Sequence, residues 1–255
     1  SVRSYTATFH RMIEIRSLTR RFPGAPQPAV DDVSFTIHRG DCAVISGANG
    51  SGKSVLMHLI ADLDRPDAGT IIIDKDETGQ KTRIGLVFQD ASAQILGETP
   101  EEDTAFGPLN LGSTRDEARR IAADCLERTG LTEKSSWPAR TLSGGEKRRL
   151  AVAGVLAMEA KVILFDEPFA NLDWPGVVQV NAIIRDLHTS GKTVIVLTHE
   201  LEKVLALANR LLVLHQGRLV YDGTPEKALA EAPLEQWGIR NPLGSYHTKE
   251  DLLWE

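Results

Sequence analysis

Short apolar runs and amphipathic stretches alternate along most of this chain of 255 residues. The apolar runs have the length and composition of strands, whereas the stretches between them repeat their apolar positions at helical spacing. The predicted strands span residues 13–15, 33–37, 43–46, 70–74, 84–88, 162–166, 193–198 and 211–214. The predicted helices span residues 53–61, 115–129, 145–158, 175–189 and 201–209. Such alternation predicts an α/β fold in which helices cover both faces of a mostly parallel sheet.

The alternation lapses between the strands that end at 88 and begin at 162, where only helical patterns occur. We therefore predict a helical lobe inserted into the α/β core. The predicted domain covers residues 12–225, with its core at about 12–89 and 160–222 and the lobe at about 90–158. Residues 226–255 are predicted to form a short C-terminal appendage.

Composition and charge narrow the possible classes of protein. Hydrophobic residues make up 42% of the chain and the formal net charge is −6, which suits a folded protein and gives no reason to expect nucleic acid as a partner. The longest uncharged apolar stretch, residues 150–158, is far shorter than the roughly 20 residues that span a bilayer, so we expect no membrane-spanning segment. Cys42 and Cys125 lie in different predicted elements, which favours two buried thiols in a reducing compartment such as the cytosol.

A glycine-rich turn follows the predicted strand at 43–46. Residues 47–54 read GANGSGKS, and a strand, a glycine-rich turn and a helix in this order are typical of a phosphate-binding P-loop. The glycines let main-chain N–H groups point at phosphate oxygens, the lysine supplies a mobile cation, and the last serine offers a hydroxyl to Mg²⁺. The predicted nucleotide contacts are Gly47, Asn49, Gly50, Ser51, Gly52, Lys53 and Ser54. The alternative is an ordinary glycine-rich turn with an exposed lysine.

Polar side chains follow three other predicted strands. Parallel strands present their carboxyl ends at one edge of a sheet, so Asp166 is predicted to lie beside the P-loop and to meet Mg²⁺ through water. Glu167 is then a candidate general base for the attacking water. A neutral His199 can hold the terminal phosphate and the water, and the Gln89 amide can contact Mg²⁺ or the water. Alternatively, these are solvated strand ends, with His199 as a helix cap or a surface residue.

A second anion site is predicted at residues 142–146, LSGGE, which precede an amphipathic helix. Ser143 and Glu146 have the spacing of a capping box, so a purely structural role is one interpretation. Gly144 and Gly145 leave the first helical amides bare, and bare amides bind anions. Because the P-loop already accounts for one set of phosphates, the nucleotide of a second subunit best explains this terminus.

Together these motifs resemble the ATP-binding cassette (ABC) ATPases over nearly the whole chain. They are GANGSGKS, Gln89, LSGGE, VILFDE, ANLD at 170–173 and His199. The resemblance implies a P-loop NTPase core with a mostly parallel sheet, N-terminal antiparallel β elements and an inserted helical lobe, and it implies ATP and Mg²⁺. It also implies that two cassettes pack head to tail. Ser143, Gly144 and Gly145 would then act on the nucleotide of the partner, and Asp173 would lie at the dimer interface.

Two further residues are interpreted through the same resemblance. Phe22 stands where the family has an adenine-stacking aromatic, although an aromatic here also suits a core or a turn. Val55 stands where the family usually has a threonine that contacts the α-phosphate. One hydrogen bond, worth about 1 kcal/mol, is therefore expected to be missing at the nucleotide.

The lobe carries a narrower resemblance. Residues 98–112, ETPEEDTAFGPLNLG, are similar to a stretch of the energy-coupling-factor and cobalt-type importer ATPases, which drive vitamin and transition-metal uptake in prokaryotes. Locally, Thr99 and Pro100 predict a helix start. The acids of this run have two interpretations: they complement the helix dipole, or they form a groove that receives a basic helix of a membrane partner.

The resemblance thus predicts the ATP-hydrolysing motor subunit of an importer at the cytoplasmic face of the cell membrane. Its expected partners are a second ABC ATPase subunit, identical or different, a transmembrane coupling protein and a membrane substrate-binding component. One alternative is a soluble ABC ATPase acting on ribosomes or DNA repair complexes, whose members commonly carry two cassettes, coiled-coil insertions or zinc cysteines that this sequence lacks. The other is a P-loop kinase, which would leave LSGGE without a role.

Overall fold

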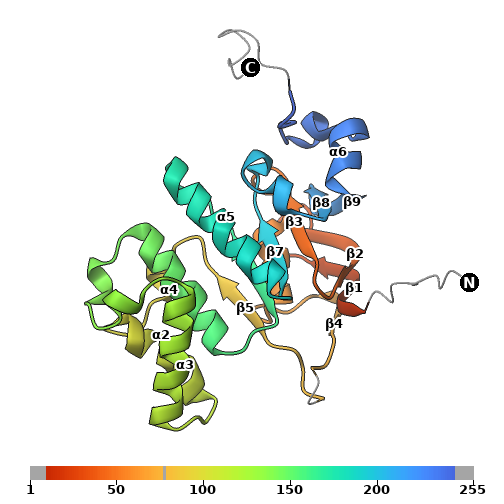
Figure 1. The fold of residues 1–255 in the computed structure, drawn as a ribbon. Coiled ribbons are helices and arrows are strands. Elements are labelled where there is room, and N and C mark those ends of the chain that lie inside the picture. The colour runs from red at the N-terminus through yellow and green to blue at the C-terminus, as the bar shows by residue number, and fades with distance from the viewer. Residues whose placement is uncertain (1–9, 77–78, 245–255) are drawn as a thin grey trace, which may run out of the picture.

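Two β-sheets form the centre of the computed structural model, which describes residues 10–76 and 79–244 (Figure 1). In spatial order the six-stranded sheet contains β5 (Ile84–Val87), β6 (Val162–Asp166), β7 (Thr193–Leu197), β3 (Cys42–Ser46), β8 (Arg210–His215) and β9 (Arg218–Gly223). Its first five strands run parallel, and β9 is antiparallel to β8. The antiparallel sheet contains β2 (Val30–His38), β1 (Arg11–Arg20) and β4 (Ala68–Ile73). The predicted fold class is confirmed.

Burial on both faces explains why the parallel strands read as continuous apolar runs. Successive side chains of a strand point to opposite faces: in β6, Val162 and Leu164 pack in one core, whereas Ile163 and Phe165 pack in the other. The first core lies between the two sheets and includes α1 (Lys53–Ile60). The second is covered by α4 (Gly144–Ala157) and α5 (Trp174–Thr189).

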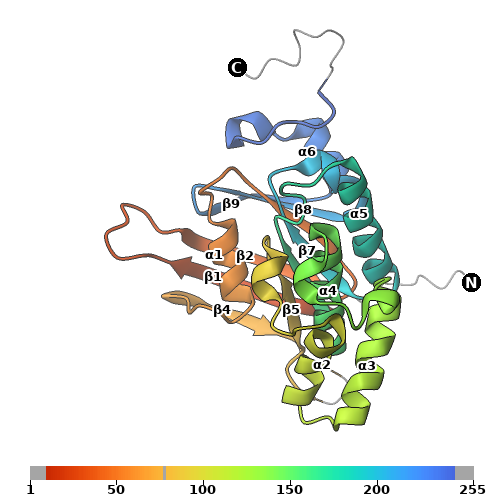
Figure 2. The same ribbon diagram turned by 90° about the vertical axis from the view of Figure 1, so that its left-hand side faces the viewer.

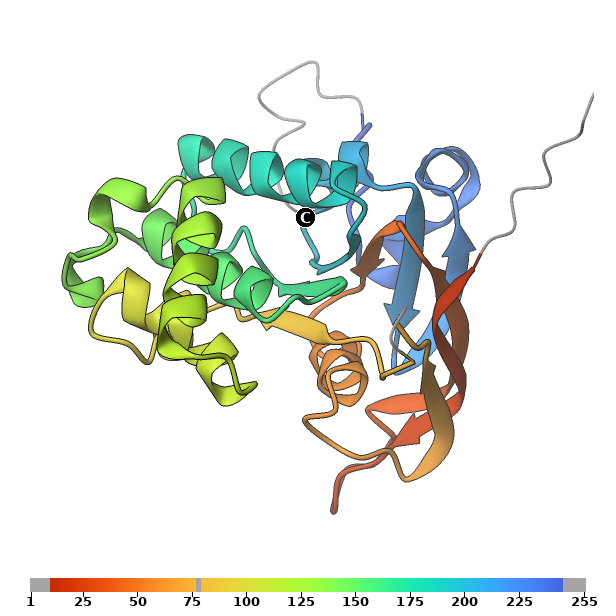
Figure 3. The same ribbon diagram turned by 60° about the horizontal axis from the view of Figure 1, so that its bottom comes forward.

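The segment between β5 and β6 forms a helical lobe to one side of the sheets (Figures 2 and 3). It contains η1 (Ala91–Gln94), α2 (Pro100–Asn110), α3 (Arg115–Arg128), η2 (Thr132–Lys134), η3 (Ala139–Thr141) and α4. Helix α2 begins as predicted, since the Thr99 hydroxyl accepts a hydrogen bond from the N–H of Glu102 at 3.3 Å and Pro100 occupies the first turn.

The prediction of a helix at 201–209 is wrong. The structure has two 3-10 turns there, η4 (Leu201–Lys203) and η5 (Leu205–Leu207). Val204 joins them with φ −137° and ψ −18°, outside the helical region. The Lys203 carbonyl oxygen, which a continuous helix would use, accepts instead from Asn181 Nδ2 at 2.6 Å. A side chain of α5 therefore replaces a helical hydrogen bond.

The C-terminal part contains elements that the sequence patterns did not predict. Strand β9 lies at the edge of the sheet with no fully buried residue, and α6 (Pro225–Glu231) is only two turns long. After η6 (Leu234–Trp237), Ile239 is buried in the same core as Leu234. Residues 226–244 of the predicted appendage therefore pack on the domain, while 245–255 lie outside the described residues. No helix in the described part of the chain has the length and apolar content of a membrane span.

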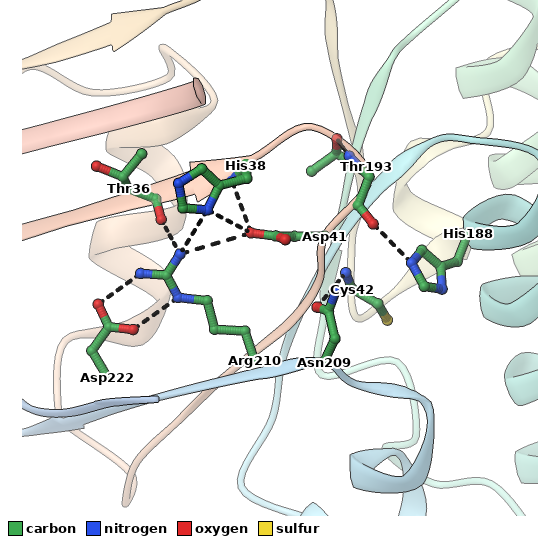
Figure 4. A network of polar contacts seen from close by, with 10 residues as sticks. Thr36, His38, Asp41, Cys42, His188, Thr193, Asn209, Arg210 and Asp222 are labelled. Atoms are coloured by element: carbon green, nitrogen blue, oxygen red, sulfur yellow. Dashed lines mark hydrogen bonds and ion pairs between the residues drawn. The ribbon is translucent and has the colours of Figure 1, made fainter. Parts of the chain in front are cut away.

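A polar network joins the two sheets at the edge where β3 and β8 begin (Figure 4). Arg210 forms a bidentate pair with Asp222, with N–O distances of 2.8 and 2.7 Å. Its Nη1 atom also donates to the carbonyl oxygen of Thr36 on β2 and lies 3.7 Å from the carboxylate of Asp41. The network therefore fixes the antiparallel sheet to the parallel sheet at the edge opposite the P-loop.

Candidate nucleotide-binding site

The glycine-rich turn follows directly on β3, all of whose residues are buried. Gly47 and Gly52 are required for close packing, because a Cβ atom at these positions would collide with the carbonyl oxygens of Leu214 and Ala29, respectively. Gly52 also has φ 100°, a conformation that favours glycine. The turn is therefore shaped by chain segments that are distant in sequence.

Helix α1 begins at the end of this turn without a side-chain cap within the described part of the chain. Its N-cap is Gly52, and no acidic residue lies in its first turn. The first helical amides therefore remain available, together with the positive end of the helix dipole. These are the features that a bound phosphate uses.

Lys53 is buried, with 6% of its surface exposed. Its Nζ atom donates hydrogen bonds to the carbonyl oxygens of Gly47 at 2.7 Å and Ala48 at 3.2 Å. Burial lowers the pKa of Lys53, while the nearby charges of Glu167 and Asp166 raise it. The ammonium group thus lies among the main-chain atoms of the turn, with two acids to favour its charge.

Glu167 follows β6 in a left-handed conformation with φ 41°, and its N–H donates to the carbonyl of Leu197 on β7 at 2.8 Å. Its Oε1 atom lies 3.0 Å from Nδ1 of His199 and 3.9 Å from Nζ of Lys53. Its Oε2 atom is buried and has no hydrogen-bond partner among the described residues. One carboxylate oxygen is held, while the other has unused capacity to accept a hydrogen bond.

Asp166 and Glu167 form an adjacent pair of acids that suits a cation. Burial raises the pKa of Asp166, and the charge of Glu167 raises it further. No group of three or more potential metal ligands from His, Cys, Asp and Glu occurs among the described residues. Mg²⁺ does not need such a group, because it typically binds one or two carboxylates together with waters and substrate phosphates. Asp166, Ser54 and Gln89 each carry the kind of oxygen donor that Mg²⁺ binds in this mode.

Gln89 follows β5, and its side chain is exposed. The main-chain carbonyl oxygen of Gln89 accepts a hydrogen bond from Nη2 of Arg148 on α4 at 3.2 Å. The end of β5 is fixed by Gln94, which accepts from Phe88 N at 3.2 Å and donates to Leu86 O at 2.8 Å. The contact with Arg148, 59 residues away, could not be expected from sequence spacing.

The LSGGE segment starts α4 with a complete capping box. The Ser143 hydroxyl accepts from Glu146 N at 3.3 Å, and the Glu146 carboxylate accepts from Ser143 N at 2.9 Å. The start of α4 is open to solvent. Ser143 and Gly144 are exposed, and a Cβ atom at Gly144 would meet nothing within 4 Å. No described hydrogen bond or ion pair joins this segment to the P-loop of the same chain.

The remaining predicted residues occupy separate places. Asp173 caps α5, with its carboxylate accepting from Gly176 N at 3.0 Å. Phe22 is 40% exposed, and the guanidinium of Arg20 lies 4.9 Å from its ring centroid. The side chain of Val55 packs against the core between the sheets.

A cavity of about 450 Å³ adjoins the P-loop and was not foreseen from the sequence. It is lined by Asn49 and His199 on one side and by Gly238 and Arg240 of the C-terminal segment on the other. The polar composition of the C-terminal segment did not predict that it lies against the P-loop. Burial of Leu234 and Ile239 holds the segment in this place.

Comparisons with known proteins identify the family of the chain. The sequence model of the ABC transporter family matches residues 30–170. A cobalt import ATP-binding protein CbiO of Rhodobacter capsulatus is 38% identical over 242 residues, which cover 91% of this chain and 86% of that protein. The energy-coupling factor transporter ATP-binding protein EcfA1 of Clostridium novyi is 37% identical, with coverage of 88% and 83%.

Solved structures show the same architecture. CbiO1 of Clostridium perfringens, described as part of the ABC transporter complex CbiONQ, has a TM-score of 0.78 at 30% identity and covers 91% of this chain and 96% of its own. A dimeric ATP-binding cassette in a post-hydrolysis state with ADP and phosphate has a TM-score of 0.71 at 27% identity, with coverage of 84% and 98%.

Proposed function

Because this chain belongs to the ABC transporter family and is an ATP-binding subunit of its energy-coupling-factor and cobalt-type importer group, we propose how its residues couple ATP hydrolysis to uptake of a vitamin or a transition-metal ion. The chain is an ATPase of a membrane transporter complex. We place it at the cytoplasmic face of the membrane, where it works with a second cassette, a transmembrane coupling protein and a membrane component that binds the substrate.

The observation that carries the catalytic proposal is the arrangement of Lys53, Glu167 and His199 at the ends of neighbouring strands. Lys53 moves from the carbonyls of the turn to the β- and γ-phosphates and stabilises their charge in the transition state. Glu167 accepts a proton from the attacking water through its unpaired Oε2 atom. His199 holds the other carboxylate oxygen and contacts the γ-phosphate.

The residues of the turn bind the rest of the nucleotide. The amides of Asn49, Gly50, Ser51 and Gly52, with those at the start of α1, contact the phosphates, and Phe22 stacks on the adenine. Val55 provides no hydroxyl for the α-phosphate. Ser54, Gln89 and Asp166 would hold Mg²⁺, which would supply positive charge to neutralise the phosphates.

We further propose that Ser143, Gly144 and Gly145 bind the γ-phosphate of the partner cassette. The exposure of Ser143 and Gly144 and the open space at Gly144 support this role, because the start of α4 can be reached from outside. Asp173 would lie at the same interface, where its capping of α5 fixes the shape of the loop. Closure of the two cassettes on ATP is then the step that does mechanical work.

A groove between α2 and α3 is proposed to receive a helix of the membrane coupling protein. The groove has a volume of about 530 Å³, and Phe106 and Leu109 in its lining are 48% and 43% exposed. Its acids are partly engaged: Glu101 lies 3.6 Å from Arg119, and Glu102 accepts from Glu98 N at 3.2 Å. An amphipathic helix therefore fits this groove better than a purely basic one.

Two measurements on purified protein test the proposed function. Phosphate release from Mg-ATP without any acceptor is expected, whereas a kinase would release phosphate only slowly without its acceptor. Copurification with a multi-spanning membrane protein from the native host is also expected. Phosphate release combined with copurification of ribosomes or DNA repair proteins would contradict the transport role and favour the soluble class.

A further inference from the structure

Arg148 is a buried cation on α4 that the proposed mechanism does not use. Only 6% of its surface is exposed. It lies in the second turn of the helix that begins with LSGGE, and its Nη2 atom donates to the carbonyl oxygen of Gln89 at 3.2 Å. This contact links the lobe directly to the main chain of a proposed Mg²⁺ ligand.

Most of the hydrogen-bonding capacity of Arg148 is unused. Its Nε and Nη1 atoms are buried without a partner, and a guanidinium carries three of its five N–H groups on these two atoms. The hydrogen bond that its guanidinium donates goes to a main-chain oxygen and not to a carboxylate. Burial lowers the pKa of Arg148. A buried charge of this kind destabilises the fold unless an acceptor reaches it.

Arg148 lines a cavity that gives an acceptor a route to its guanidinium. This cavity has a volume of about 380 Å³ and lies between the loop after β5, the start of α4 and the loop before α5. Its one acidic lining residue is Asp90, which directly follows Gln89. Asp90 Oδ1 accepts from Ser92 N at 2.9 Å, so the carboxylate is held on the short loop that lines the cavity.

We propose that Arg148 is a positioning residue for ATP hydrolysis: it holds the main chain of Gln89 from α4, and it pairs with the Asp90 carboxylate when lobe and core close on the nucleotide. The inference rests on the proposed ATPase function. Arg148 holds the main-chain carbonyl of Gln89, whose side chain is exposed. A shift of α4 therefore carries the side-chain amide of Gln89 with it. The pairing with Asp90 then locks the loop in the position that hydrolysis requires.

The first test compares Arg148→Gln and Arg148→Lys in the full chain. Binding of ATP relies on the P-loop, whereas Gln89 acts at the reacting end, so we expect Arg148→Gln to lower kcat about tenfold or more while KM changes less than about twofold. Because the substitution removes an unpaired buried charge, Tm is expected to stay equal or rise. Arg148→Lys keeps the charge with a single nitrogen, and it should recover part of kcat.

Arg149→Gln is the matched control, because Arg149 is the next residue on α4 and has no hydrogen bond to Gln89. Its kcat is expected to remain close to that of the wild type. A wild-type kcat in Arg148→Gln would overturn the positioning role. A joint fall in kcat and Tm, with no recovery in Arg148→Lys, would also overturn it, because that pattern indicates a purely structural residue.

A double-mutant cycle with Asp90→Asn tests the pairing. If the two side chains pair in the catalytic state, Asp90→Asn lowers kcat, and the double variant is no slower than Arg148→Gln alone. Wild-type activity in Asp90→Asn, or independent losses that multiply, would overturn the pairing. Failure of the wild-type protein to hydrolyse ATP would instead count against the proposed function, so the two failures are distinguishable.

Discussion

The Nδ1 atom of His199 lies 3.0 Å from Oε1 of Glu167, and this contact leaves Oε2 of the same carboxylate without a partner among the described residues. A carboxylate held on one side by an imidazole has a fixed orientation toward anything that approaches the other oxygen. The ammonium of Lys53 lies 3.9 Å from the same oxygen, so both contacts are made to Oε1 and the hydrogen-bonding capacity of the buried Oε2 stays unused.

Glu167→Gln is predicted to retain ATP binding and to lose hydrolysis. The amide keeps the shape of the side chain but cannot accept a proton, so phosphate release should fall about 10²–10⁴-fold, the usual contribution of a general base. With ATP bound and not cleaved, a stable dimer should accumulate, which size-exclusion chromatography with light scattering would detect. Undiminished turnover would refute the role of Glu167 as base. Glu159→Gln, an exposed acid near the other end of β6, serves as the control.

Ser143→Arg is predicted to prevent ATP-dependent dimerisation without affecting ATP binding by the monomer. The long charged side chain would cover the amides at the start of α4. In the Glu167→Gln background, the dimer that ATP traps should therefore be absent. Thr114→Arg is the matched control, because Thr114 and Glu117 form the same kind of capping box on α3. Loss of such a cap lowers the free energy of unfolding by about 1 kcal/mol. Normal dimerisation by Ser143→Arg would argue against action across subunits.

Phe106→Glu is predicted to weaken association with the membrane partner. The substitution places a charge in the apolar part of the groove between α2 and α3, where burial of an unpaired carboxylate is unfavourable. We expect at least a tenfold loss of copurified membrane protein, with ATP binding by the isolated chain unchanged. Leu63→Glu alters another exposed apolar residue outside the lobe and should copurify normally. Equal losses in both variants would indicate a general effect of added charge.

The two cysteines lead to a prediction about pH. Burial raises the pKa of Cys42 and of Cys125 from 9.0 to about 11. The folded state therefore binds the thiol protons more tightly than the unfolded state, so this contribution to stability is complete below about pH 9 and is lost as pH rises through about 11. Urea midpoints should fall more steeply over this window in the wild type than in Cys42→Ala/Cys125→Ala. Parallel pH profiles would contradict the assignment.

Helix starts could be predicted from the sequence where the hydrogen bonds that form them join residues close together in the chain. Thr99 and Pro100 mark the start of α2, and Ser143 and Glu146 mark the start of α4, since both caps form from residues within four positions of each other. The helix predicted at 201–209 failed for the opposite reason. Its competing hydrogen bond comes from Asn181, on a different helix.

The candidate site divides in the same way. Lys53, Glu167 and His199 could be placed together because the carboxyl ends of parallel strands share an edge. The contacts that shape the site, from Arg148 to Gln89 and from Gly238 toward Ala48, join segments about 59 and 190 positions apart. No local pattern encodes such pairs.

The bracing of the P-loop by distant segments has a consequence for synthesis of the chain. Gly217 N donates to Ser51 O at 3.1 Å, and the Leu214 carbonyl closes against Gly47. The ribosome makes these bracing residues 166 and 167 positions after their partners in the turn. A nascent polypeptide arrested before β8 should therefore capture no ATP, and the nucleotide can assist folding only once nearly the entire domain has emerged.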